Sequence, residues 1–218
     1  MIGSIILKYI LISILISFIF GTTVLTDKVT RKFNRGKLIS PYLFQLWSLL
    51  IFIVIWCFNK SKIEIFEVSR LTRWSNVFLM IIAVIPTSII VNWGGKSKKN
   101  APFSIANFLN GASMEIPQRL LVQNMFVILN CNISIYGSAR LGIFLNALIW
   151  VQFIIVQEFI CGKKITKKTI REIIASAWFS IWAGLLYSIT GNIIISMVTH
   201  GLERIAAHWI NQKVYMLY

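Results

Sequence analysis

The stretch SIILKYILISILISFIFGTTVL, residues 4–25, decides the fold class of this chain. Lys8 is the only charged residue in it. A helix needs about 20 predominantly apolar residues to cross the hydrocarbon core of a bilayer. The stretch is also longer than the apolar core of a signal peptide, about 7–15 residues, and lacks a small-x-small exit. We therefore expect residues 4–25 to form a membrane-spanning helix that stays in the protein.

The composition of the whole chain supports the same fold class. Of its 218 residues, 57% are hydrophobic and only 13% are charged, and the mean hydropathy is +0.75. In soluble domains, about a quarter of the residues are charged. Disordered chains have a low content of apolar residues. The composition excludes both classes. It predicts an all-α, polytopic transmembrane helical bundle that forms one integral membrane domain over residues 1–218.

Six further apolar stretches follow the first, so we expect about seven spans. Residues 1–100 hold three N-terminal spans, and residues 103–210 hold a core of four. The seven predicted spans cover residues 4–25, 41–58, 75–94, 103–130, 139–161, 173–189 and 193–210.

The net charge of +15 is explained mainly by the loops between the spans. Loops after the first, third and fifth spans carry 5, 3 and 5 basic residues, against 4, 1 and 0 in the other loops. Basic loops stay in the cytoplasm, which predicts an external N-terminus and a cytoplasmic C-terminus. The same residues favour contact with anionic lipids of the cytoplasmic leaflet. Because the basic residues are divided among separate loops, we expect no nucleic-acid partner.

The fourth predicted span contains two ionisable residues at membrane depth. Glu115 and Arg119 are four residues apart, which places them on one helix face and in contact. A charge at that depth costs about 2.5–3.5 kcal/mol unless it is compensated. Either the pair fixes the position of the helix, or it takes part directly in chemistry. Pro117 lies between them and predicts a kink.

The last predicted span contains a second polar group, in the sequence THGLERIAAHW. His200, Arg204 and His208 follow one another at intervals of four and share a helix face, and Glu203 can reach His200. His200 follows an apolar run and is the best functional candidate among them. Alternatively, the helix leaves the membrane near residue 203, and the later polar residues contact water.

Together these segments resemble the CAAX-protease and bacteriocin-processing (CPBP, or Abi) family. The matching pieces are Met114-Glu115-Ile-Pro-Gln-Arg119 and Gly184-Leu-Leu-Tyr187-Ser-Ile-Thr190-Gly191-Asn192, followed by His200. The resemblance covers residues from about 103 to 204. It implies an intramembrane endopeptidase with an active site that opens into the membrane, in which a glutamate or a metal ion activates water.

The chain departs from the family pattern at three places. Met114 stands where the family has the first of two glutamates, so Glu115 and Arg119 match the second glutamate and the arginine. The fifth span lacks the family's histidine; its place falls on Ile154 or, in a shifted register, on Gln152. In the last motif His200 matches, whereas Arg204 replaces an asparagine or aspartate.

Two functions follow from this resemblance. The first is an active endopeptidase that cleaves hydrophobic peptides or membrane proteins, with Glu115 as the base, His200 assisting, and Arg119, Arg204 and Gln152 completing the site. The second is a degenerate member that binds such a partner without cutting it, in immunity or regulation. A small transporter is a third class, although no repeat symmetry is evident. We expect no cofactor and no metal, because His200 and Glu115 alone give too few ligands. The abundance of Ile, Lys and Asn favours a bacterial cell membrane.

Overall fold

The computed structural model of this chain is helical throughout the part that it describes. That part comprises residues 2–32, 42–59, 65–70, 73–93, 105–129, 135–160 and 164–213. Its only bridge of β type is an isolated antiparallel pair, Phe66 with Asn192. The all-α prediction is therefore confirmed for the described residues.

Each of the seven predicted spans coincides with helical structure. Six of them contain one continuous helix each: α1 (Ile2–Lys32), α2 (Leu43–Asn59), α3 (Trp74–Asn92), α6 (Ile135–Ile160), α7 (Lys167–Thr190) and α8 (Ile193–Lys213). The end of α1 and the start of α7 take in residues that the sequence places in loops. Lys28, Arg31 and Lys32 belong to α1, and Lys167, Lys168 and Arg171 belong to α7.

The fourth predicted span is not one helix. Residues 103–130 contain α4 (Ile105–Ser113), the π-helix η3 (Ile116–Gln123) and α5 (Asn124–Leu129). Pro117 explains part of the break, because it has no backbone N–H to bond to the preceding turn. π-Helices are rare and are concentrated at functional sites, which directs attention to η3.

Four helices in the described part are long and apolar enough to cross a membrane. Their apolar windows are Ile5–Thr22, Trp74–Asn92, Gly137–Val156 and Lys167–Thr190. Helix α2 is apolar but has only 17 residues, and α8 carries His200, Glu203 and Arg204 near its centre. These features are consistent with a multi-pass membrane protein. The expected number of about seven spans is not confirmed.

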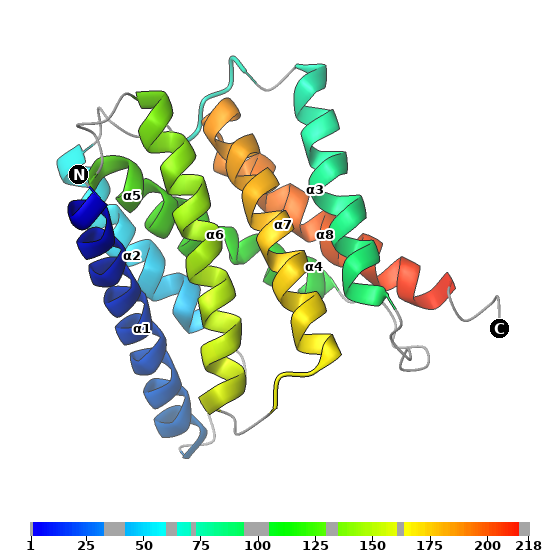
Figure 1. Cartoon of the computed structure of the whole chain (residues 1–218), viewed down its shortest axis with the longest axis horizontal. Helices are drawn as coiled ribbons and strands as arrows, with labels where there is room; N and C mark the ends of the chain where they lie inside the picture. Colours follow the sequence, from blue (N-terminus) through cyan, green and yellow to red (C-terminus); the bar gives the residue numbers. More distant parts are fainter. Residues whose placement is uncertain are drawn as a thin grey trace.

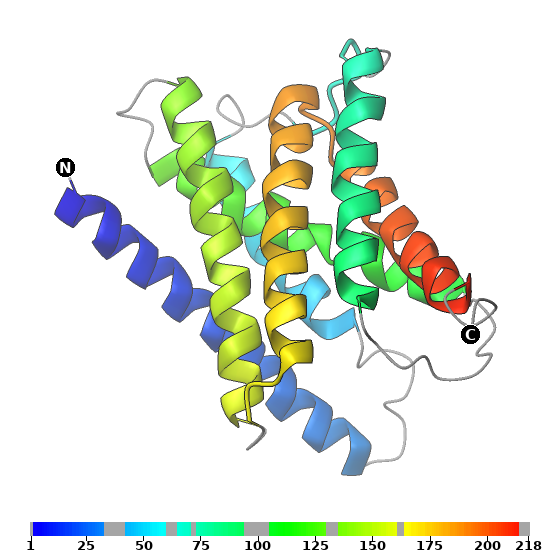
Figure 2. The ribbon, with the colours of Figure 1, turned by 45° about the vertical axis from the view of Figure 1, so that its right-hand side comes forward.

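Helices α6, α7 and α3 lie side by side as one layer, in that order, and α4 and α8 cross behind them (Figure 1). Helix α7 packs against α6 on one side and α3 on the other, while α8 packs against α3 and α4. Helices α1 and α2 lie beyond α6, and α2 packs on η3 (Figure 2). The broken segment α4–η3–α5 therefore runs through the middle of the molecule.

Aromatic side chains fill the core between α1, α2 and α6. Phe44 and Trp150 are buried, and Phe20 and Phe153 pack on them with ring centroids 5.0–6.3 Å apart. Such pairs add to the free energy of burial by about 0.5–1.5 kcal/mol each. They hold the outer helices against the layer that carries the polar residues.

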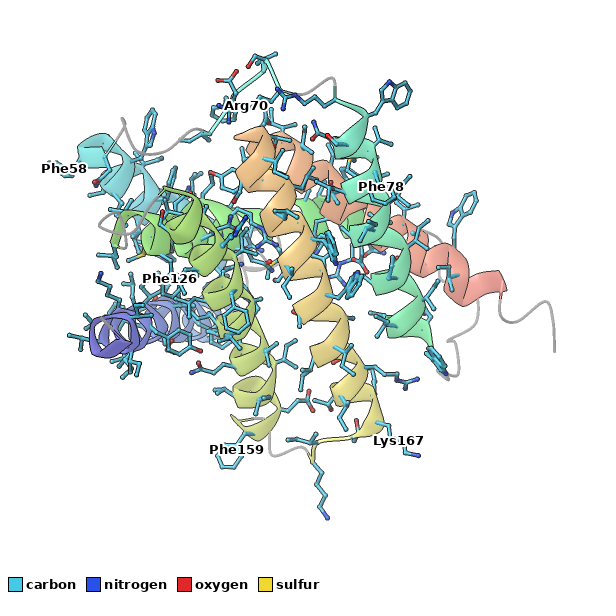
Figure 3. All side chains as sticks on the ribbon, turned by 45° about the horizontal axis from the view of Figure 1, so that its top comes forward. Phe58, Arg70, Phe78, Phe126, Phe159 and Lys167 are labelled. Carbon is cyan, nitrogen blue, oxygen red and sulfur yellow. The ribbon has the colours of Figure 1, made fainter. Side chains whose placement is uncertain are left out.

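The exterior of the bundle is apolar. Phe58, Phe78 and Phe159 point away from it (Figure 3), and their exposed fractions are 84%, 64% and 84%. Large exposed apolar surfaces mark contacts with membranes or partners. Several of the loop lysines and arginines used to predict orientation, including Arg35, Lys37 and Lys96, lie outside the described residues.

A short extended segment joins the second loop to the turn between α7 and α8. The backbone N–H of Ile193 donates to the carbonyl of Ile65 at 2.9 Å, and that of Glu67 donates to Gly191 at 3.1 Å. The side chain of Asn192 also donates to the carbonyl of Glu67 at 3.0 Å. These bonds to residues 65–67 fix the position of the first turn of α8.

Candidate functional site

The site is built around η3, in which every fourth side chain carries a polar group. Glu115 precedes the π-helix, and Arg119 and Gln123 lie inside it. All three are buried, with exposed fractions of 0%, 0% and 1%. A buried charge is costly unless it is paired and hydrogen-bonded. The partners of these three residues therefore determine how this part of the bundle is assembled.

Both carboxylate oxygens of Glu115 are occupied. Arg119 Nε donates to Oε2 at 2.9 Å, and His200 Nδ1 lies 2.7 Å from Oε1. A carboxylate accepts hydrogen bonds, so Nδ1 carries the hydrogen in this pair. The contact joins η3 to α8 across 85 residues of sequence. It fixes the orientation of the imidazole and leaves Nε2 as its other ring nitrogen.

Arg119 and Gln123 connect η3 to α7. Arg119 Nη1 donates to Gln123 Oε1 at 3.3 Å, and Gln123 Nε2 donates to the carbonyl of Gly184 at 3.1 Å and to Ser188 Oγ at 2.9 Å. A Cβ atom at position 184 would lie 2.9 Å from Gln123 Oε1 and 3.1 Å from Arg119 Nη1. Glycine at this position therefore makes room for the polar network.

The rest of the Gly184–Asn192 motif shapes the turn between α7 and α8. Tyr187 Oη accepts a hydrogen bond from Asn124 at 2.9 Å, which ties α7 to the start of α5. Gly191 ends α7 in the left-handed conformation, with φ of 62°. Asn192 Oδ1 then accepts the N–H of Ile194 at 2.9 Å, as an N-cap residue does. The motif thus serves to place α8, and with it His200, against η3.

His200 is held from three sides. Besides Glu115, its ring packs on Phe179 with centroids 4.4 Å apart. Gly111 of α4 lies against the same turn of α8: a Cβ there would lie 2.7 Å from Arg204 Cγ and 3.0 Å from the His200 carbonyl oxygen. The close crossing of α4 and α8 therefore depends on this glycine. His200 is 5% exposed, so almost its whole side chain is buried.

A pocket of about 370 Å³ lies beside His200, between α3, α6, α7 and α8. Met114 and Gln118 contribute to its wall from the broken segment, whereas Glu115 is not among its lining residues. Its apolar wall comes mainly from α6 and α7: Trp150, Phe153, Ile154, Ala175 and Phe179. Pockets that bind drug-sized ligands have volumes of about 300–1,000 Å³, so this one can hold a small ligand or one or two peptide side chains.

Four of the five predicted site residues lie in or next to this site. Glu115, Arg119 and His200 form a connected chain of contacts. Arg204 lines the pocket, and its Nε is 3.4 Å from the carboxylate of Glu203, which is also in the wall.

The structure does not bring Gln152 together with the other four predicted residues, and Gln152 does not line the pocket. Its Oε1 accepts a hydrogen bond from Tyr9 of α1 at 2.7 Å. Ile154, two residues further along α6, lines the pocket instead. Because residues two apart on a helix lie on nearly opposite faces, the two registers that the sequence left open exclude each other. The structure places Ile154, and not Gln152, in the pocket wall.

The site also contains residues that had not been singled out as functional. Gln118, Gln123 and Phe179 contact the pocket or the buried chain of polar groups. The spacing of Glu115, Arg119 and Gln123 at intervals of four is a signal in the sequence that could have identified Gln123. No such pattern identifies Phe179.

The residues present do not fit a metal centre. Within the described part of the chain, no three His, Cys, Asp or Glu side chains approach one another closely enough to hold a metal ion. His200 and Glu115, the two nearest candidates, are hydrogen-bonded to each other. A catalytic zinc ion needs three protein ligands.

Comparison of this chain with protein-family models, curated proteins and solved structures finds no match. The resemblance to the CPBP family therefore depends on the sequence motifs quoted above alone.

Proposed function

We propose that this protein binds a hydrophobic segment of a peptide or membrane protein in the pocket beside His200 and does not cleave it. One observation carries the proposal: the broken segment contributes Met114 to the pocket wall, while the neighbouring Glu115 is outside that wall. Glu115 is fully buried, and both of its oxygens are bonded to Arg119 and His200. A general base must come within hydrogen-bond reach of the water it activates. Glu115 is instead a positioning residue in this proposal.

The proposal treats the chain as a CPBP-like protein that keeps the polar clamp of the family and lacks its base. It extends to the surroundings of the protein: a bacterial cell membrane, about seven spans, an external N-terminus and a cytoplasmic C-terminus. The apolar exterior and the four long apolar helices support placement in a membrane. The basic residues of the odd-numbered loops support the orientation and contact with anionic lipids.

The experiment measures cleavage and binding together. The native chain and the variants Glu115→Gln and His200→Ala are reconstituted in liposomes with a library of hydrophobic peptides. Mass spectrometry counts new peptide termini, and the peptides that remain bound are recovered and identified. We expect retained peptides and no new termini from the native chain. New termini that disappear in either variant would show an endopeptidase and overturn the proposal.

An endopeptidase remains the second candidate, because the bond between Glu115 and His200 favours it. A carboxylate bonded to Nδ1 holds a histidine in the tautomer in which Nε2 can accept a proton. His200 also lines the pocket. In this alternative His200, rather than Glu115, takes the proton from water. The experiment above separates the two candidates, since only the second predicts new termini that require His200.

A further inference from the structure

The pocket contains a buried amide whose hydrogen-bonding capacity is only partly used. Gln118 is 6% exposed and lines the pocket. Its Oε1 accepts a hydrogen bond from Ser180 Oγ at 3.4 Å, and its Nε2 has no hydrogen-bond partner within the described part of the chain. An amide nitrogen carries two donors. Because Gln118 lines the pocket, these donors are available to a ligand carbonyl there.

The pocket also contains a buried carboxylate with spare acceptor capacity. Glu203 is 4% exposed, and its one ion pair in the described residues is with Arg204 Nε at 3.4 Å. No hydrogen bond to its carboxylate is found there. The Arg204 side chain is half exposed, so the two groups of this pair differ in burial. A carboxylate accepts about four hydrogen bonds, which leaves Glu203 able to bind a further donor.

The pocket wall holds more acidic than basic side chains, whereas the chain as a whole is basic. Glu172, at the outer end of the wall with 40% of its side chain exposed, adds a second carboxylate. The chain has only 7 acidic residues and 22 basic ones, yet the wall holds two carboxylates and one guanidinium. Trp150, Phe153 and Phe179 supply aromatic faces, which attract cations at distances up to about 6 Å.

We propose that this pocket is selective for a basic side chain, Lys or Arg, next to an apolar residue in the bound peptide. Glu203 receives the cation, Gln118 donates to a peptide carbonyl, and the aromatic wall covers the apolar neighbour. This inference rests on the proposed function, which requires only that a hydrophobic peptide binds. It adds the chemical class that is bound and the residue that selects it.

The test uses three photoreactive dipeptides and the full chain in phosphatidylcholine nanodiscs. Each dipeptide is acetylated and amidated and carries photo-leucine followed by lysine, norleucine or glutamate. Mass spectrometry locates the labelled residues and measures the yield. We expect the lysine dipeptide to label the pocket wall about tenfold more efficiently than the norleucine dipeptide, as a charged hydrogen bond allows. The glutamate dipeptide should label it least.

Two variants with the same change of charge show whether Glu203 is responsible. Glu203→Gln should abolish the preference for lysine, and Glu158→Gln, which removes a carboxylate outside the pocket wall, should preserve it. Norleucine labelling of Glu203→Gln reports that this variant still folds. If it does not fold, Glu203→Asp replaces it as the test. Aspartate keeps the carboxylate on a shorter side chain, so this variant should show a weaker preference for the lysine dipeptide.

Each other outcome overturns a defined part of the inference. Equal labelling by lysine and norleucine overturns the selection of a cation and leaves peptide binding intact. A preference for lysine that survives in Glu203→Gln overturns the role of Glu203. Competition by phosphatidylethanolamine added to the nanodiscs, without competition by free lysine peptides, assigns the site to a lipid amine and overturns the peptide assignment. No labelling of the wall by any dipeptide overturns both this inference and the proposed function.

Discussion

Glu115 connects two elements, since one of its oxygens binds Arg119 of η3 and the other binds His200 of α8. In a low-dielectric interior, such a contact contributes less to net stability than to the choice of one arrangement. Removing one partner of the pair nevertheless strongly destabilises the fold, because the other charge is then buried without compensation. Arg119 Nη2 already has no partner among the described residues, so the guanidinium depends on Glu115.

The first prediction concerns this ion pair. Glu115→Gln should lower the free energy of unfolding by about 3–5 kcal/mol, the cost of breaking a buried pair. Denaturation of the reconstituted protein measures it. The control is Glu172→Gln, whose partner Lys168 is 3.6 Å away with 78% of its side chain exposed. That exposed pair should contribute at most about 1 kcal/mol. Equally small losses in both variants would contradict a stabilising role for Glu115.

The second prediction concerns Gly191, where the chain turns from α7 into α8 with φ of 62°. Gly191→Ala should cost about 1–2 kcal/mol, because a Cβ atom disfavours the left-handed conformation. Gly191→Asn should cost less, since asparagine adopts this conformation more readily. The same denaturation measurement compares the two. An alanine variant as stable as the native chain would show that the turn has another conformation.

At the scale of elements, Gly111 and Gly21 offer a matched pair of glycines for a third prediction. A Cβ atom at Gly111 would approach Arg204 Cγ to 2.7 Å and the backbone of His200 to 3.0 Å, whereas nothing lies within 4 Å at Gly21. Gly111→Ala should therefore separate α4 from α8 and cost about 1–3 kcal/mol, as overpacking does. Gly21→Ala should be neutral or stabilising, because alanine favours helix. Denaturation again measures both, and equal effects would contradict the close crossing.

Hydropathy predicted the positions of the helices because it depends on the local sequence alone. Each apolar stretch, from residues 4–25 to 193–210, contains helical structure. The break in residues 103–130 was only partly predictable. Pro117 indicated a kink, but the π-helix that contains it is bonded to α7 through Gln123. The α7 partners lie about 60 residues away in sequence. Tertiary contacts of this kind leave no periodic signal.

The site shows the same division between local and distant contacts. Spacing alone placed Arg119 next to Glu115, because residues four apart share a helix face. The contact of Glu115 with His200 joins residues 85 apart, so no spacing rule could give it. Spacing also could not show that Gln152 lies apart from the other predicted residues, where it accepts a hydrogen bond from Tyr9 of α1. The sequence showed Met114 beside Glu115, but only the structure shows that Met114 belongs to the pocket wall.

At the scale of the whole molecule, the two ends of the bundle carry different loops. Arg70 and Lys167 lie at opposite ends (Figure 3). The segment with Arg70 follows the second predicted span, and Lys167 follows the fifth. The distribution of basic residues predicts that the first end faces the outside and the second faces the cytoplasm. Because one bundle separates these two ends, labelling one residue at each end tests the orientation of the entire chain.

The last prediction uses Val68→Cys and Lys167→Cys, each in a chain whose Cys57, Cys131 and Cys161 are replaced by serine. Val68 is 68% exposed, and Lys167 is also exposed, so both new thiols are accessible. In intact cells, a membrane-impermeant maleimide should label Val68→Cys and should label Lys167→Cys only after permeabilisation. The cysteine-free chain is the control. The reverse pattern would invert the orientation, and labelling of both sites in intact cells would contradict a bundle that spans the membrane, since the two thiols would then face the same compartment.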